Sequence, residues 1–462
     1  MVHPSASETG EPTGEPSSSA GGRTVLPPLV PGRRLRNLIA RYRDTLGLYR
    51  WLHSEHGAIV RYKILSFEFC LLSDPELIEE VLYAKRSAFV KGFMYKRSLL
   101  LARPTIITGD GEGHKRRRGL VQPYFHSKTL STYSSIMADQ AVAMRNRWSD
   151  GEIFDMDNAA HELTLSISLK IFFGNTALVD TEMLRKVLKL CVVDVGSALL
   201  PSHGLRRLIL SSFRSLQRAY RSMNEQVVGL IEAARTDGTP RSDFVAYMAR
   251  ATDENGEFAF SQEEVVDGVV EMLIASVTTT ATTIAWATYY LARNPSVRER
   301  MEREVDQTLN GRVPTLEDYE RLRFTGAVIA EVLRLAPPAY YLGRKATRDC
   351  TVGEYFIPAG SNVQLFYFLS QRDERYFPQA ETFRPERWLE TQAARPRCSY
   401  MPFSSGTRDC AGEAFARINM TFALASIAQR WRLELVSDEL PKLNTLASYA
   451  FRNGLLVKAS AR

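Results

Sequence analysis

The sequence predicts a mainly α-helical protein with a small β-sheet region. Helical patterns dominate the chain from about residue 75 to about residue 334. The period-two patterns that are typical of strands are short and lie towards the two ends of the chain. No stretch with the composition of a linker follows the first thirty residues, so we expect the 462 residues to form one large body.

The N-terminal segment differs in composition from the rest of the chain. Residues 1–24 are rich in Ser, Gly, Pro and Glu. They lack the apolar core of a signal peptide and the long apolar run of a membrane anchor. We expect a disordered tail over residues 1–24, a single domain over residues 25–462 and no membrane span.

The next elements are a helix, a β-hairpin and a second helix. Residues 34–56 carry a helical pattern, and residues 58–65 and 67–72 form two alternating runs with one residue between them. A helix over residues 75–83 follows, because an Asp-Pro pair supplies an N-cap and a proline at the first helical position.

Strand signals return only near the C-terminal end of the chain. They occupy residues 351–363, 431–436 and 455–457. We therefore expect the small sheet region to be assembled from both ends of the sequence around a helical body.

A long apolar helix is predicted between these two regions. It begins with a capping box at Ser261 and Glu264 and continues to about Arg293. Its length and apolarity predict a helix that passes through the middle of the molecule. Five threonines lie between Val277 and Ile284, and they need an explanation because threonine is a mediocre helix former.

The composition fits a large enzyme better than a nucleic-acid-binding protein. The chain is 45% hydrophobic and 24% charged, with a net charge of +7. Basic residues cluster only briefly, at residues 33–36 and 115–118, with neither a nucleic-acid motif nor interleaved aromatic residues. We expect no nucleic-acid partner. The basic surface is either simply solvated or receives an acidic partner protein.

Cys410 is the residue whose surroundings carry the most chemical information. It ends the run from Phe403 through Gly406 and Arg408, and Gly412 follows it before a helical pattern. A thiolate at a helix N-terminus is suited to bind a metal. The alternatives are a buried free thiol, a zinc ligand or half of a disulfide. A disulfide is disfavoured because the other four cysteines, Cys70, Cys191, Cys350 and Cys398, are far apart in sequence and the total is odd; zinc is disfavoured because no C-x-x-C pair exists.

The spacing F-x-x-G-x-R-x-C-x-G resembles the haem-ligand loop of the cytochrome P450 family, the haem-thiolate monooxygenases. The resemblance covers about residues 25–457 and implies the cytochrome P450 fold, of the soluble bacterial type. It implies that Cys410 binds the iron of haem b and that Phe403, Gly406, Arg408 and Gly412 form the loop around it.

Two further motifs resemble the same family. Glu331 and Arg334 are three residues apart on one helix face, and Arg387 lies in a later F-x-P-x-R-W motif of the family type. The resemblance implies a buried ion network among these three that supports the haem loop. It also implies that four cations face the haem propionates: His114, Arg118, Arg344 and Arg408. For His114 and Arg118 the alternative is a solvated basic helix end.

The long helix carries the family's oxygen-binding signature with one departure. Ala275 and Thr279 match its small residue and its threonine, so the Thr279 hydroxyl can bond the Ala275 carbonyl and open the helix there. Thr278 stands where relatives have Asp or Glu, which relay protons during dioxygen activation. We therefore expect Thr279 and Thr278 to be catalytic. Either the Thr and Ser hydroxyls with ordered water replace the acid, or a substrate group assists, or the chemistry differs from simple hydroxylation.

The resemblance implies a monooxygenase that inserts one oxygen atom from O2 into a hydrophobic small molecule, here taken to be a terpenoid or other secondary metabolite. Thr278 also favours an alternative, a haem-thiolate enzyme for rearrangement, coupling, desaturation or peroxide use. A non-catalytic haem carrier is a third hypothesis. We expect a cytoplasmic monomer that receives electrons from a ferredoxin and a ferredoxin reductase. The predicted substrate pocket contains Met94, Ile274, Ala339, Tyr340 and Ser448.

Overall fold

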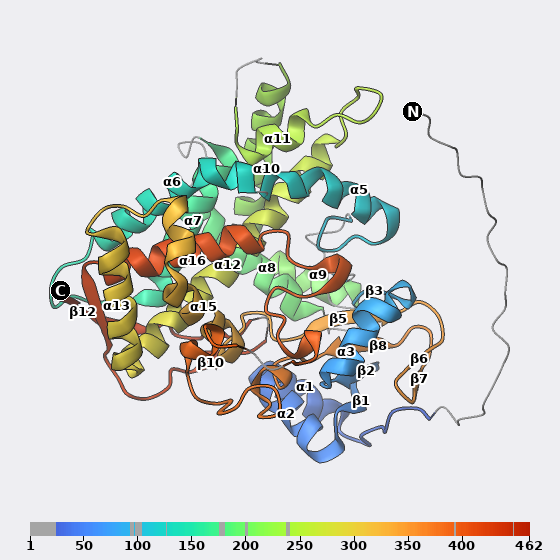
Figure 1. Ribbon diagram of the computed structural model, residues 1–462. Coiled ribbons are helices and arrows are strands. Elements are labelled where there is room, and N and C mark those ends of the chain that lie inside the picture. Colours follow the sequence, from blue (N-terminus) through green and yellow to red (C-terminus); the bar gives the residue numbers. More distant parts are fainter. Residues whose placement is uncertain are drawn as a thin grey trace, which may run out of the picture.

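The computed structural model describes residues 25–92, 97, 104–125, 127–174, 181–198, 202–236, 241–391, 394–446 and 448–462. It has a large helical body, with small sheets at the lower right and at the left of the view in Figure 1. The α-helices are α1 (Arg34–Arg43), α2 (Thr45–His56), α3 (Pro75–Glu79), α5 (Gly111–Val121), α6 (Ser127–Arg145), α7 (Met156–Phe173), α8 (Thr181–Ser197), α9 (His203–Ser212), α10 (Arg214–Thr236), α11 (Phe244–Arg250), α12 (Gln262–Arg293), α13 (Pro295–Leu309), α14 (Leu316–Arg321), α15 (Arg323–Leu335) and α16 (Glu413–Ala428).

The strands form one larger sheet and three small ones. They are β1 (Ile59–Ile64), β2 (Phe67–Leu72), β3 (Phe89–Lys91), β4 (Ile153–Asp155), β5 (Leu342–Ala346), β6 (Cys350–Val352), β7 (Tyr355–Ile357), β8 (Asn362–Leu365), β9 (Trp431–Leu435), β10 (Leu443–Asn444), β11 (Ala450–Phe451) and β12 (Leu456–Ala461). The larger sheet has the order β1-β2-β8-β5-β3, in which only β2 and β8 run parallel. It joins strands from both ends of the chain, which confirms the predicted mainly α class and sheet assembly.

The predicted helix over residues 34–56 is two helices, so this prediction was wrong in its length. Asp44 separates α1 from α2, and its side chain accepts a hydrogen bond from the backbone N–H of Gly47 at 2.9 Å. Glycine is required there because a Cβ atom on Gly47 would lie 2.2 Å from the Asp44 carboxylate. The capping hydrogen bond of Asp44 favours the start of a new helix over continuation of α1. Helix α1 therefore ends here although no proline is present.

The second predicted helix also changes form along its length. Asp74 caps α3 as expected, accepting from the backbone N–H groups of Glu76 and Leu77. The helix then widens into one π-helical turn, η1 (Glu80–Ala84). The hairpin before it is present, and its turn places Leu65 at a φ of 52°.

The long helix α12 crosses the middle of the molecule (Figure 1). Its capping box is present, and it contacts α7, α15 and α16. In the described part of the chain, α12 alone is long and apolar enough to cross a bilayer, and most of its apolar stretch is buried inside the protein, as in a core helix.

Candidate functional site

The Cys410 loop is a tight connection that precedes α16. The backbone N–H of Cys410 donates to the carbonyl oxygen of Phe403 at 2.8 Å, and Gly406 has a φ of 79°. A Cβ atom on Gly406 would lie 3.0 Å from the carbonyl oxygen of Leu82, so both the conformation and the close approach favour glycine. These contacts leave the Cys410 side chain exposed at the end of the loop.

The thiol of Cys410 is chemically suited to a metal. Desolvation by the surrounding protein raises its pKa, although the backbone N–H of Gly412 donates to the sulfur and opposes that rise. The thiolate therefore needs a nearby positive charge, which a metal ion supplies directly. All five cysteines are free thiols.

Thr279 is exposed to accessible space, although most of its helix, α12, is buried. Thr279 is exposed, whereas Val277 and Thr280 beside it are buried. The predicted hydrogen bond is present, because Thr279 Oγ1 donates to the Ala275 carbonyl oxygen at 2.7 Å. The predicted opening of the helix is not seen, since α12 is α-helical throughout. A carbonyl oxygen has two lone pairs and can accept this hydroxyl while it keeps its backbone donor.

Hydroxyl groups of α7 contact α12 one and two residues before the position that lacks an acid. Thr278 is half-buried on α12. Next to it, Ser276 Oγ lies 2.9 Å from Ser168 Oγ, and Thr164 Oγ1 donates to the Val277 carbonyl oxygen at 3.2 Å. The hydroxyl groups of α7 and α12 therefore meet at the helix crossing, where they can pass protons but hold no charge.

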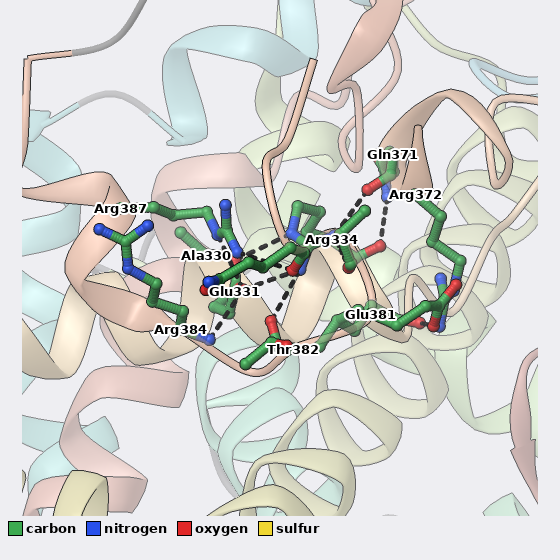
Figure 2. Close-up of polar contacts among 12 residues, drawn as sticks. Ala330, Glu331, Arg334, Gln371, Arg372, Glu381, Thr382, Arg384 and Arg387 are labelled. Carbon is green, nitrogen blue, oxygen red and sulfur yellow. Dashed lines mark hydrogen bonds and ion pairs between the residues drawn. The ribbon is translucent and has the colours of Figure 1, made fainter. Parts of the chain in front are cut away.

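Glu331, Arg334 and Arg387 come together in the core (Figure 2). Glu331 and Arg334 have no exposed surface. Arg334 donates to both carboxylate oxygens of Glu331, at 2.9 and 2.8 Å, and Arg387 Nε donates at 3.0 Å. Trp388 Nε1 and the backbone N–H of Arg384 complete the set at 2.9 and 3.0 Å. The sequence analysis did not assign these last two donors.

The network connects to the start of the Cys410 loop through two polar contacts. Gln371 is fully buried; its Nε2 donates to the Arg334 carbonyl oxygen at 2.9 Å, and its Oε1 accepts from the backbone N–H of Met401 at 3.2 Å. Tyr400 Oη donates to the Ala330 carbonyl oxygen at 3.1 Å. The ion network therefore supports the segment that leads into Phe403.

The predicted cations gather on one side of the Cys410 loop. Arg408 donates to the Gly109 carbonyl oxygen and to Asp110 Oδ1, both at 2.6 Å. Arg118 Nη1 donates to the Asp409 carbonyl oxygen at 2.6 Å, next to Cys410. Arg344 is buried on β5. His114 is also buried, and desolvation together with nearby arginines lowers its pKa to about 4.

Lys91 belongs to this group, although the sequence analysis missed it. It pairs with Arg344 in the register of β3 and β5, and its backbone N–H donates to Asp110 Oδ1 at 2.9 Å. Burial, Arg344 and Arg408 lower the pKa of its ammonium group to about 7. A small cavity of about 40 Å³ has Lys91, Arg344 and Arg408 in its lining. So many crowded cations would be stabilised by anions, and the two propionates of haem meet that requirement.

The five predicted pocket residues lie in three places: beside the site, in the core and outside the described residues. Ile274 is half-buried on α12, and Ala339 is exposed. Ser448 lies near Ala339, because Ser448 Oγ donates to the Pro338 carbonyl oxygen at 3.1 Å. Tyr340 is only 1% exposed, and its hydroxyl donates to the Thr445 carbonyl oxygen. Its ring packs against Phe366 and Phe368. Met94 lies outside the described residues.

Glu271 is a second residue that the sequence analysis missed. It has no exposed surface and lies on α12, one turn before Ala275. Its carboxylate accepts from Thr105 Oγ1 and from the backbone N–H groups of Ile106 and Ile107, at 3.0 and 2.5 Å. It therefore fixes the segment that leads into α5 and its cations. Despite these bonds, desolvation raises the pKa of Glu271 to about 7.

Glu271→Gln should make the protein more stable at alkaline pH than the wild type. Because the folded-state pKa of Glu271 is above that of the unfolded chain, the folded state binds the extra proton, and stability falls as pH rises from about 4.5 to about 7. At pH 4, where the carboxyl is mostly protonated in the folded and in the unfolded chain, the pH-dependent difference between the two proteins should be small. At pH 8 the free energy of unfolding of the variant should exceed that of the wild type by up to about 3 kcal/mol. Urea unfolding at both pH values measures this, and a stability difference that is independent of pH would contradict it.

Comparison with known proteins gives consistent matches. The family model described as Cytochrome P450 matches residues 27–456. The chain is 31% identical to cyclooctatin synthase of Streptomyces melanosporofaciens over 82% of this chain and 83% of that protein. It is 28% identical to pentalenene oxygenase of Streptomyces avermitilis over 88% and 91%. Among solved structures, retinoic acid bound cyanobacterial CYP120A1 matches with a TM-score of 0.82 at 21% identity, covering 95% of this chain and 100% of that one.

Proposed function

Since this chain belongs to the cytochrome P450 family, we propose that it inserts one oxygen atom from O2 into a terpenoid or a similar hydrophobic secondary metabolite. The family makes it a monooxygenase with a haem-iron cofactor. Similarity to cyclooctatin synthase, cyclooctat-9-en-7-ol 5-monooxygenase and pentalenene oxygenase supports the substrate class.

Two observations carry this function: Cys410 is exposed at the end of its loop just before α16, and Thr279 is exposed on α12, a helix that contacts α16. Cys410 would hold the iron of haem b. Lys91, His114, Arg118, Arg344 and Arg408 would hold its propionates. Haem bound through a thiolate supplies the activation of O2, with two electrons and two protons, for attack on a C–H bond.

The protein's own contribution is to orient these groups and to deliver protons. The Thr279 hydroxyl is fixed by its bond to Ala275 and can pass a proton towards the accessible space beside it. Thr278 cannot carry charge, so protons must arrive through hydroxyl groups and water. The same feature supports a second candidate, a haem-thiolate reaction other than hydroxylation.

The electrons would come from a ferredoxin and its reductase. The basic surface of the protein supports an acidic donor, since opposite charges steer such encounters.

Thr278→Asp should raise the yield of product per electron by roughly twofold or more and change the solvent isotope effect, because the carboxylate restores a charged proton relay. Thr278→Asn is the matched control, since it has nearly the same shape and cannot ionise. If both variants behave alike, position 278 does not take part in proton delivery. Thr279→Ala should release more hydrogen peroxide.

The substrate class is tested with the haem-loaded protein. Cyclic terpenoid hydrocarbons and their alcohols, added one at a time, should shift the haem from low to high spin and yield products heavier by one oxygen atom, as measured by mass spectrometry. Fatty acids of equal carbon number serve as the comparison. Tighter binding and faster oxidation of the fatty acids would refute the terpenoid proposal. A spin shift with rearranged, non-oxygenated products would favour the second candidate.

A further inference from the structure

Helix α1 buries two polar residues and exposes two large apolar ones, while its Leu38 and Ala40 are half-buried against the core. Asn37 and Arg41 are each only 2% exposed, whereas Leu35 is 63% and Ile39 47% exposed. The inward residues are satisfied, because Asn37 Nδ2 donates to the Lys63 carbonyl oxygen at 2.9 Å and Arg41 Nη2 to Tyr341 Oη at 2.9 Å. Burying polar residues while leucine and isoleucine face outward is the reverse of an ordinary surface helix.

The segment before α1 extends this apolar surface. Its backbone pairs with β1: the N–H of Val30 donates to the Arg61 carbonyl oxygen at 2.8 Å, and the N–H of Arg61 donates to the Pro28 carbonyl oxygen at 2.7 Å. Because α1 also packs on β1, the two pieces are neighbours at the lower edge of the view in Figure 1. Their exposed large apolar side chains are Val25, Leu26, Leu29, Leu35 and Ile39.

This concentration is not the scatter that is normal on a protein surface. Among the described residues, fourteen large apolar side chains are exposed, and five of them lie within residues 25–39. Single exposed apolar residues need no explanation, but a group of them marks an interaction surface.

The charge around these residues indicates the chemistry of the partner. Residues 25–43 contain five arginines and no acidic residue. Arg36 and Arg43 are exposed on the same side of α1 as Leu35 and Ile39, because the four positions fall within about 100° of the helical wheel. A helix face with arginines beside leucine and isoleucine matches a surface of lipid chains and anionic headgroups.

We propose that residues 25–43 form a docking surface for an anionic lipid bilayer. Leu35 and Ile39 insert at the boundary between headgroups and acyl chains, and Arg36 and Arg43 contact the lipid phosphates. The helix lies in the plane of the membrane, and no part of the chain needs to cross it. This arrangement holds the enzyme where apolar molecules accumulate.

Vesicle sedimentation with the full-length, haem-loaded protein tests the proposal. The protein should bind vesicles of equimolar phosphatidylcholine and phosphatidylglycerol and bind pure phosphatidylcholine at least about tenfold more weakly. Raising NaCl from about 50 to about 500 mM should weaken binding to the anionic vesicles.

Two pairs of variants separate the apolar from the electrostatic contribution. Leu35→Ser/Ile39→Ser should reduce anionic-vesicle binding by about tenfold or more. The control Val436→Ser/Leu440→Ser removes two equally exposed apolar residues elsewhere and should have no effect. Arg36→Glu/Arg43→Glu should abolish the preference for anionic lipid. The control Arg303→Glu/Arg452→Glu makes the same charge change at other exposed positions and should retain it.

Three results would overturn the proposal. The first is no binding to anionic vesicles at low salt. The second is equal loss of binding in the α1 variants and in their controls. The third is concentration-dependent dimerisation without lipid that disappears in Leu35→Ser/Ile39→Ser, which would identify a second copy of the chain as the occupant. Unchanged haem content and melting temperature in each variant show that it folds.

Discussion

Cys410→Ala should abolish monooxygenase activity while leaving the protein folded. The Cys410 side chain is exposed at the end of its loop, so truncating it leaves no cavity and removes only the acceptor of the half-buried Gly412 N–H. The free energy of unfolding of the haem-free chain should change by about 0.5 kcal/mol or less. Activity should be undetectable, because the variant has no thiolate to donate electron density to the iron.

The matched control for this substitution is Cys350→Ala. Cys350 is also a free thiol and is half-buried on β6, in a different element from the loop. This control should retain full activity and the same haem content per chain as the wild type. If Cys410→Ala oxidised substrate at a comparable rate, another group would be the haem ligand, and the assignment of the site would fail.

Glu331→Ala should have the largest effect on stability. The substitution leaves the Arg334 guanidinium buried without its carboxylate, and Arg387 loses one of its acceptors. Breaking a buried ion pair from one side costs about 3–5 kcal/mol. Because Gln371 and Tyr400 connect this network to the Cys410 loop, haem retention should fall as well.

Urea unfolding of Glu331→Ala and of Glu386→Ala separates the network from an ordinary ion pair. Glu386 pairs with Arg300 at 3.0 Å, but both side chains are partly exposed. Losing that pair should cost about 1 kcal/mol or less. If the two variants are destabilised equally, the Glu331 network does not have the structural role assigned to it.

The sequence predicted the parts of the molecule that depend on several residues at fixed spacing. The Cys410 motif, the Glu331–Arg334 pair and the Ser261 capping box each combine residue types whose chemistry is complementary at short range. Such combinations are informative because chance rarely supplies every member. The mainly α class followed from the same reasoning applied to apolar periodicity.

The sequence did not reveal features that depend on a single residue and its burial. Lys91 and Glu271 carry no motif, and only their buried positions beside other charged or polar groups give them importance. Tyr340 follows two prolines in an apolar run that is compatible with either a pocket wall or the core. The break at Asp44 was missed because the capping bond competes with the helix without any proline to mark it.

The outward face of α1 is another feature that the sequence alone did not predict. A pattern of leucines and arginines predicts a helix but does not say which side faces the protein. The structure decides this through the hydrogen bonds of Asn37 and Arg41.

The central claim, that Cys410 is the thiolate ligand of a haem iron, is tested most directly by the absorption spectrum of the reduced protein under carbon monoxide. The account predicts the strongly red-shifted Soret band of a thiolate-ligated haem in the wild type and in Cys350→Ala, and its absence in Cys410→Ala. A wild-type Soret band at the position of a histidine-ligated haem, or survival of the red-shifted band in Cys410→Ala, would contradict it.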